Sequence, residues 1–261
     1  MIKTYKSSEI DACREASKIS SMVLDEVIDL IEVGNTTEDI DDFCFKRIKE
    51  LGATPAPLFY RGFPKVSCTS LNHVICHGIP SKDKLLKKGD ILNIDVTSII
   101  DGWHGDTSRM FKVGEISVKA QNLMKVTHQC LMEAIGVIKP GEKISQIGKT
   151  IDQIAGSNNF SVVQDFCGHG VGKKFHENPS IVHYYDPHYD SLEFISGMIF
   201  TIEPMINEGD YRTKLLNDGW TAVTKDKKLS AQFEHTVGIT NDGYEIFTLS
   251  KKSLDFPPYK L

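Results

Sequence analysis

Gly89-Asp90-Ile91-Leu92-Asn93-Ile94-Asp95 and, later in the chain, Gly197-Met198-Ile199-Phe200-Thr201-Ile202-Glu203 are two matching stretches of sequence. In each, a run rich in apolar and β-branched residues follows a glycine, which is typical of a strand. Each run ends in a carboxylate. This repeated pattern predicts two similar strands that carry their acidic residues at corresponding positions.

Helical spacing of apolar residues precedes each of these strands. The pattern predicts a helix over 8–33 that starts near a Ser-x-x-Asp cap at Ser8, and a second over 37–51 that ends at Gly52. Similar patterns cover 123–138 and 144–154, with a Pro-Gly break between them.

Two helix-helix-strand halves predict an α/β (α+β) fold in one catalytic domain, 1–261. Its pseudo-two-fold halves span about 1–112 and 113–250, with a short C-terminal tail after them, and we expect the active site where they meet. Chance similarity between ordinary α/β segments is the alternative explanation of the repeat.

Composition narrows the function class. The 261 residues include 40% hydrophobic and 25% charged residues, and the net charge of -5 does not favour nucleic acid as a partner. No signal-like segment or long apolar run is present, so we expect a cytoplasmic protein without a membrane segment. The cysteines are scattered without a Cys-x-x-Cys pair, which favours reduced thiols over a disulfide scaffold.

A hairpin is expected to bring two acidic residues together. Alternation places Asp95 and Thr97 on the same face of the first strand. The Asp101-Gly102 pair is a hairpin signal, and it is followed closely by Asp106. The carboxylates of Asp95 and Asp106 should therefore lie close together.

The second half supplies His169 between two glycines, Glu203 before a proline, and Glu234 in a strand-like context. With Asp95 and Asp106 this makes four carboxylates and one imidazole. The carboxylates would repel one another strongly in a partly buried site, whereas two divalent cations would neutralise their charge. Oxygen-rich ligation with one imidazole suits manganese, iron, cobalt or zinc.

Five ordered motifs resemble those of type I methionine aminopeptidases, in the bacterial form, of peptidase family M24. They are Asn93-Ile94-Asp95-Val96-Thr97, His104-Gly105-Asp106-Thr107-Ser108, Gly168-His169-Gly170-Val171-Gly172, Thr201-Ile202-Glu203-Pro204-Met205 and Gln232-Phe233-Glu234-His235-Thr236. The resemblance extends over nearly the whole chain. It implies the pita-bread fold and a dinuclear, metal-dependent hydrolase that removes N-terminal methionine, with a preference for a small second residue.

The resemblance also implies individual roles. Asp106 and Glu234 would bridge two metal ions, Asp95 would bind one, and His169 with Glu203 would complete the other. Glu203 could also accept a proton from water. Two further histidines, His77 and His176, would contact the substrate peptide group and stabilise the tetrahedral oxyanion.

A pocket for the methionine side chain is expected from the same resemblance. Its candidate residues are Tyr60, Phe63, Cys68, Phe175 and Trp220, and aromatic rings suit a polarisable thioether. Pro57 and Phe63 depart from the common bacterial pattern, in which a cysteine and a tyrosine are frequent. Both changes preserve an apolar slot but leave its polarity open.

Nascent chains with N-terminal methionine are the expected partners, with the ribosome as a candidate place of action, and a monomer is expected. One alternative is an Xaa-Pro aminopeptidase or dipeptidase, which shares this fold and usually carries an additional N-terminal domain. The other is a non-catalytic binding protein that docks through lysine-rich segments such as 82–88, although such segments are more simply explained as solvated loops.

Overall fold

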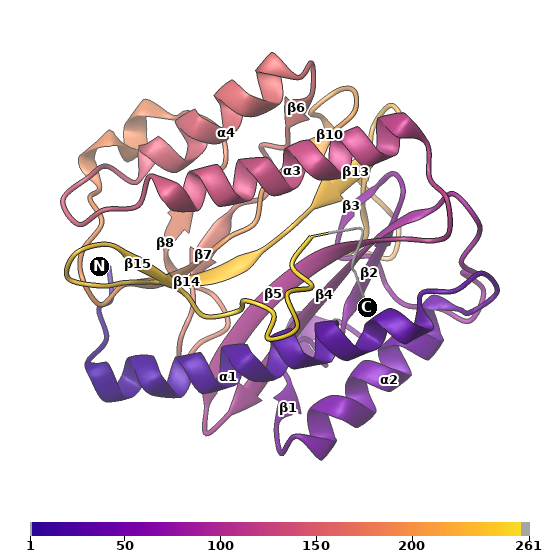
Figure 1. The fold of residues 1–261 in the computed structure, drawn as a ribbon, viewed down its shortest axis with the longest axis horizontal. Helices are drawn as coiled ribbons and strands as arrows, with labels where there is room; N and C mark the ends of the chain where they lie inside the picture. Colours follow the sequence, from indigo (N-terminus) through magenta and orange to yellow (C-terminus); the bar gives the residue numbers. More distant parts are fainter. Residues whose placement is uncertain (1, 257–261) are drawn as a thin grey trace.

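A computed structural model describes residues 2–256 of the chain. Its α-helices are α1 (Ser7–Glu26), α2 (Thr37–Glu50), α3 (Val118–Gly136) and α4 (Ser145–Ser157), and its 3₁₀ helices are η1 (Val27–Leu30), η2 (Tyr60–Gly62) and η3 (Pro187–Ser191). The long helices α1 and α3 run side by side across one side of the strands (Figure 1). None of the helices within these residues is both long enough and apolar enough to span a bilayer.

The strands form several antiparallel sheets. They are β1 (Thr54–Pro55), β2 (Cys68–Leu71), β3 (Val74–Cys76), β4 (Ile91–Ile100), β5 (Trp103–Lys112), β6 (Ser161–Val162), β7 (Gly168–Gly170), β8 (Glu177–Ile181), β9 (Ile199–Ile202), β10 (Met205–Asn207), β11 (Thr213–Leu215), β12 (Ala222–Thr224), β13 (Ser230–Gln232), β14 (His235–Ile239) and β15 (Tyr244–Ile246). One sheet has the order β1-β4-β2, with β5 also paired to β4, and another has the order β15-β14-β9-β7-β8. Smaller sheets have the orders β13-β10-β6 and β11-β12-β3.

The succession helix, helix, antiparallel strand pair occurs twice. In the first half α1 and α2 precede the β4–β5 pair, and in the second half α3 and α4 precede the pair formed by β9 and β14. The two pairs meet where Ser108 of β5 forms an isolated antiparallel bridge with Glu234. The repeated pattern predicted from the sequence is therefore present in the order of the elements.

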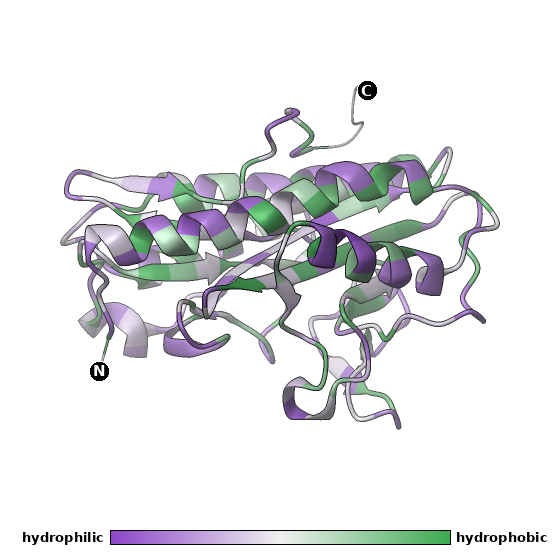
Figure 2. Cartoon of the chain, turned by 90° about the horizontal axis from the view of Figure 1, so that it is seen from below, coloured by the Kyte–Doolittle hydropathy of each residue, from purple (hydrophilic) through white to green (hydrophobic). Residues whose placement is uncertain are grey.

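Apolar burial explains why the helices lie on the strands. One core cluster joins α1 and α2 to β4 and β5, and contains Val23, Ile40, Leu92 and Phe111. A second joins α3 and α4 to β9 and β14. Figure 2 shows the long α-helices in one layer with the strands beneath them, and irregular segments with short helical turns on the opposite side. One face of the strands thus packs against the helices in the core, and the opposite face is available for a functional site.

The first helix differs from its prediction at both ends. It begins at Ser7, with Lys6 at the N-cap, because the Glu9 carboxylate accepts a hydrogen bond from the backbone N–H of Lys6 at 2.9 Å. The predicted cap at Ser8 is therefore wrong. The α-helix ends at Glu26 and continues only as the 3₁₀ helix η1.

The other helix predictions agree better with the structure. Helix α2 is capped by Thr36, whose hydroxyl accepts from the backbone N–H of Asp39 at 3.1 Å. It is followed by Gly52 with a φ of 77°, which confirms the predicted stop. Helix α3 begins earlier than the apolar pattern indicates, because Ser117 caps it.

The segment after β15 crosses the helical side between α1 and α3 (Figure 1). Arg109 of β5 is only 1% exposed and donates to the Asp25 carboxylate at 2.5 Å and to the carbonyl of Leu254 at 3.3 Å. This buried cation therefore ties the tail segment to α1 and β5. Residues 257–261 of the predicted tail lie outside the described residues.

Candidate metal centre

One cavity of about 290 Å³ is lined by every side chain that the sequence singled out for metal, catalytic or substrate contact. These residues are Tyr60, Phe63, Cys68, His77, Asp95, Asp106, His169, Phe175, His176, Glu203, Trp220 and Glu234. They come from both halves of the fold, from β4 and β5 on one side and from the region of β7, β9 and β14 on the other. The expectation of a site between the halves agrees with this arrangement.

The β4–β5 hairpin places Asp95 and Asp106 on one face. Thr97 lies directly opposite Asp106 in the ladder, and its hydroxyl donates to Oδ1 of Asp106 at 2.5 Å. Asp95 shares the face of Thr97 because side chains alternate along a strand. Asp101 and Gly102 both have positive φ, 52° and 78°, as a two-residue hairpin turn requires. The predicted hairpin is confirmed.

His169 is held in the tautomer that a metal ligand needs. Its Nδ1 lies 3.0 Å from the carbonyl of Gly170, and a carbonyl can only accept, so Nδ1 carries the proton. Nε2 of the neutral ring is then a free acceptor. It lies 3.6 Å from Oδ2 of Asp106 and 3.7 Å from Oε1 of Glu203.

Glu203 follows β9 directly and is oriented by hydrogen bonds to both of its carboxylate oxygens. The hydroxyl of Thr201 donates to Oε1 at 2.9 Å, and the side-chain amide of Gln232 donates to Oε2 at 3.2 Å. Its backbone N–H donates to Nε2 of His183 at 3.1 Å. Such outer partners fix the direction of a carboxylate before any ligand arrives.

Glu234 stands in the break between β13 and β14, so its predicted strand-like context holds for the residues on either side of it. Its backbone N–H donates to the carbonyl of Ser108 at 3.0 Å, and its carbonyl accepts from the hydroxyl of Thr107 at 2.8 Å. These bonds tie Glu234 to β5, the strand that carries Asp106. Glu234 is 2% exposed, and it lines the same cavity.

The electrostatics of the site favour a bound cation. Burial, followed by the charge of Asp106, raises the pKa of Asp95, Glu203 and Glu234 well above the usual range of carboxyl groups. Burial raises the pKa of Asp106 to about 7, against the hydrogen bond from Thr97, and lowers the pKa of His169 to about 4. The charged carboxylates therefore lack a compensating positive charge, and the imidazole is neutral.

The donor set fits divalent metal ions. Asp106, His169 and Glu234 can each offer one ligand atom, and these atoms lie within 4.8 Å of one another. Asp95 and Glu203 line the same cavity outside this closest group. Carboxylate oxygens with one imidazole nitrogen suit divalent transition ions, whose charge would offset the repulsion.

His77 and His176 lie on the wall of the cavity. The His77 ring stands edge-on to Phe166 and Trp220, with centroids 5.5 and 6.1 Å away. The His176 ring stacks on Tyr60 at 5.2 Å, and its Nδ1 lies 3.0 Å from the Tyr60 hydroxyl. Burial lowers the pKa of both histidines, that of His176 to about 3, so both rings are neutral at pH 7.

Aromatic rings form an apolar wall next to the carboxylates. Phe63 and Trp220 meet edge-on at 5.2 Å, and Tyr60 contacts Phe175 at 4.9 Å. Pro57 also lines the cavity, so both positions that depart from the common bacterial pattern belong to this wall. The slot is thus apolar on one side and acidic on the other.

The sequence reasoning missed several residues of the site. Thr97, Thr201, Gln232 and His183 orient the acidic residues, and Cys76, Asp165, Phe166, Cys167 and Met205 also line the cavity. The spacing of some of these residues from the predicted ligands could have identified them. Thr97 and Thr201 each stand two positions from a predicted ligand on the same strand, and Gln232 stands two positions before Glu234. His183 had no comparable signal.

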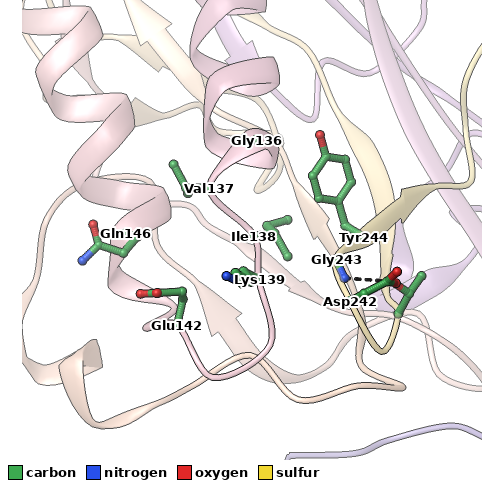
Figure 3. A pocket seen from close by; sticks show the side chains of 10 residues that line it. Gly136, Val137, Ile138, Lys139, Glu142, Gln146, Asp242, Gly243 and Tyr244 are labelled. Carbon is green, nitrogen blue, oxygen red and sulfur yellow. Dashed lines mark hydrogen bonds between the residues drawn. The ribbon is translucent and has the colours of Figure 1, made fainter.

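Cavity size alone does not identify the site. A larger hollow of about 640 Å³ lies where the end of α3 faces the β14–β15 turn, and Figure 3 shows Lys139, Glu142, Gln146 and Asp242 around it. None of the predicted metal or substrate residues lines it. The smaller cavity has the convergent polar groups and shifted pKa values that mark a functional site.

Comparisons with known proteins agree with this geometry. Residues 11–241 match the family described as metallopeptidase family M24. The chain belongs to this family. M24 relatives include the methionine aminopeptidase of Rickettsia prowazekii, which is 51% identical over 259 residues that cover 99% of each chain. The family resemblance read from the five motifs is therefore confirmed.

Solved M24 structures confirm the fold. A crystal structure of methionine aminopeptidase from Rickettsia prowazekii superposes with a TM-score of 0.93 at 50% identity, covering 95% of this chain and 100% of the other. A prolidase from Pyrococcus furiosus reaches a TM-score of 0.75 at 22% identity, and the match covers only 66% of its length. The second similarity shows the shared pita-bread fold alone.

Proposed function

We propose that this chain is a methionine aminopeptidase, a metal-dependent exopeptidase that removes N-terminal methionine. The observation that carries the proposal is the cavity in which four carboxylates, two of them buried (Asp106 and Glu234), and His169 face an aromatic wall. The identity of 51% with a methionine aminopeptidase over nearly the full chain supports it. Hydrolysis and methionine recognition would then occur at opposite sides of one slot.

Two divalent ions are proposed as cofactors, drawn from manganese, iron, cobalt or zinc. Asp106 and Glu234 would bridge them, Asp95 would hold one, and His169 with Glu203 would hold the other. When bound, such ions activate water at neutral pH and polarise the scissile carbonyl. Two observations support this assignment. Nε2 of His169 is free to bind a metal ion, and the possible ligand atoms of Asp106, His169 and Glu234 lie close together.

Glu203 is the proposed general base. Its two oxygens already accept hydrogen bonds from Thr201 and Gln232, so the carboxylate has a fixed direction. A carboxylate held in this way can accept the proton of the attacking water without losing its orientation.

The two wall histidines are proposed to stabilise the oxyanion. If the Tyr60 hydroxyl donates to Nδ1 of His176, Nε2 of that ring carries the proton and can donate to the substrate. His77 would donate from the opposite side, beside Trp220. Neutral donors of this kind stabilise a developing negative charge.

The aromatic wall is proposed to receive the methionine side chain. Tyr60, Phe63, Phe175 and Trp220 offer ring edges and faces to a thioether, and Cys68 adds a small apolar surface. We also propose the preference for a small second residue that the family resemblance implies. Met-Gly peptides should therefore be cleaved faster than Met-Leu peptides.

The cellular setting is also proposed. The enzyme would act in the cytoplasm as a monomer, on peptides and nascent chains that begin with methionine, with the ribosome as the place where such chains emerge. It would form one catalytic domain whose halves span about 1–112 and 113–250. Light scattering of the purified protein tests the monomer directly.

Peptide hydrolysis tests the function itself. Met-Ala-Ser and Ala-Pro-Ala are incubated with the metal-loaded protein, and the released amino acids are identified by mass spectrometry. Release of methionine from the first peptide alone is the expected result. Cleavage before proline would indicate an Xaa-Pro peptidase, and no cleavage with any metal would indicate a binding protein of this fold.

A further inference from the structure

A tight turn presents His176 to the cavity. The backbone N–H of Lys174 donates to Oε1 of Glu177 at 3.0 Å, so the side chain of Glu177 closes a turn with Phe175 and His176 at its centre. Both central residues line the cavity. The position of the His176 ring therefore depends on where the Glu177 carboxylate is held.

The Glu177 carboxylate is itself held by the N-terminal segment. Its side chain is 8% exposed, and its Oε2 accepts a hydrogen bond from the Tyr5 hydroxyl at 2.7 Å. The ammonium group of Lys3 lies 3.6 Å from Oε1. Each oxygen of this nearly buried carboxylate thus has a partner, and hydrogen bonds to charged groups are among the stronger ones in proteins.

Tyr5 is well placed to act as an anchor. It is 7% exposed, its ring stands edge-on to Trp103 at 5.2 Å, and its backbone N–H donates to the carbonyl of Gly197 at 2.8 Å. The approach of Tyr5 to the loop is close, because a Cβ built on Gly172 would lie 2.1 Å from the tyrosine oxygen. Tyr5 therefore connects the core to the turn that carries His176.

We propose that Tyr5 and Glu177 are positioning residues that act through His176, so that the N-terminal segment sets the geometry of the oxyanion donor. This proposal rests on the proposed function, because it assigns a catalytic purpose to the position of His176. Neither residue contacts the five candidate metal ligands through a hydrogen bond described above. Their effect should therefore appear in catalysis and not in metal content.

Kinetics of a mutant cycle test the coupling. Tyr5→Phe removes the hydroxyl and keeps the ring, and it should lower kcat for Met-Ala-Ser about tenfold with little change in KM or bound metal. In a His176→Ala background the same substitution should have no further effect, because coupled residues are not additive. Glu177→Gln should behave like Tyr5→Phe.

Tyr185→Phe is the matched control. The Tyr185 hydroxyl also donates to a carboxylate, that of Asp190 at 3.1 Å, but on an exposed segment away from the cavity. Tyr185→Phe should therefore leave kcat unchanged. If Tyr5→Phe lowered kcat by the same factor with and without His176, its effect would be a general one and the positioning role would be wrong.

A spectroscopic measurement separates this proposal from the proposed function. Histidine imidazole resonances are recorded on the ¹⁵N-labelled, metal-loaded protein, with His176 assigned through His176→Ala. Tyr5→Phe should shift the His176 signals and leave those of exposed His188 in place. Unshifted His176 signals in Tyr5→Phe would overturn the proposal. If Tyr5→Phe shifts the His176 signals but the wild-type protein releases no methionine, only the proposed function is overturned.

Discussion

Nε2 of His169 lies 3.6 Å from Oδ2 of Asp106, and these two residues belong to different halves of the fold. The contact exists because the backbone of Glu234 is hydrogen bonded to Ser108 of β5, which brings the sheet with β7 and β9 against the β4–β5 hairpin. The candidate metal centre is therefore formed only when both halves are folded and joined.

Replacement of Glu234 tests the ligand assignment. Glu234→Gln keeps the shape but removes a charge that would bridge two cations, so bound metal should fall and kcat/KM should drop by more than about a hundredfold. Metal content is measured by atomic emission after dialysis. Glu115→Gln makes the same change on an 89% exposed side chain and should alter neither quantity; full metal content in Glu234→Gln would contradict the assignment.

The Thr97 hydroxyl should affect metal affinity without being a ligand. Thr97→Val removes the hydrogen bond to Asp106 and keeps the side-chain volume, so the affinity for metal should weaken about tenfold. Calorimetric titration measures this. Thr240→Val is the control, since its hydroxyl donates to Asp242 at 3.0 Å on the exposed surface. Equal affinities of Thr97→Val and wild type would show that this bond does not orient Asp106.

Alanine at either wall histidine should slow the chemical step. His77→Ala and His176→Ala should each reduce kcat by about a hundredfold, since loss of one oxyanion donor has effects of this size. Metal content should remain that of the wild type. Steady-state kinetics with Met-Ala-Ser measure the effect, and His188→Ala on the exposed surface is the control. Unchanged kcat with normal metal content would exclude the proposed role.

Arg109 should matter for stability. Its partner Asp25 is 3% exposed, so Asp25→Asn would leave a buried guanidinium without its counter-charge. The free energy of unfolding should fall by about 3 kcal/mol, measured by urea denaturation. Lys88→Met breaks the exposed ion pair with Glu115 and should cost less than about 1 kcal/mol. Similar losses of unfolding free energy in the two variants would show that burial of the Arg109–Asp25 ion pair does not increase its contribution to stability.

Acid should destabilise the fold through His128 of α3. Burial against Phe233 and Phe256 lowers the pKa of His128 to about 4, below its unfolded value. A depressed histidine pKa means that the unfolded chain binds more protons, so this contribution is complete above the unfolded pKa and is lost as the pH falls towards the folded one. Relative to His128→Leu, wild type should lose unfolding free energy between about pH 7 and pH 4. Parallel curves would show that His128 does not titrate in this way.

Local sequence signals predicted the elements more fully than the contacts between them. The Asp101-Gly102 turn predicted the hairpin and hence the proximity of Asp95 and Asp106, because ladder register follows from a two-residue turn. The cap at Ser8 was wrong because Glu9 binds the backbone of Lys6, a competition between neighbouring polar side chains that spacing does not resolve.

Tertiary contacts explain what the sequence could not predict. The hydrogen bond from the backbone N–H of Glu203 to His183 and that from the Tyr5 hydroxyl to Glu177 both join segments that are distant in the chain. They form only after these segments have packed together. The ligand set was predicted because its motifs resemble those of a known family. Of the outer residues that orient these ligands, Thr97, Thr201 and Gln232 lie inside the motifs but were given no role, and His183 lies outside every motif.

The dependence of methionine release on bound metal is the decisive property of the proposed enzyme. The protein is stripped with a chelator and then titrated with manganese, iron, cobalt or zinc, while bound metal and methionine release from Met-Ala-Ser are measured on the same samples. We expect no release from the stripped protein and a rate that rises with the amount of metal bound at the carboxylate cluster. Undiminished release by fully stripped protein, or no release with any of these metals, would contradict it.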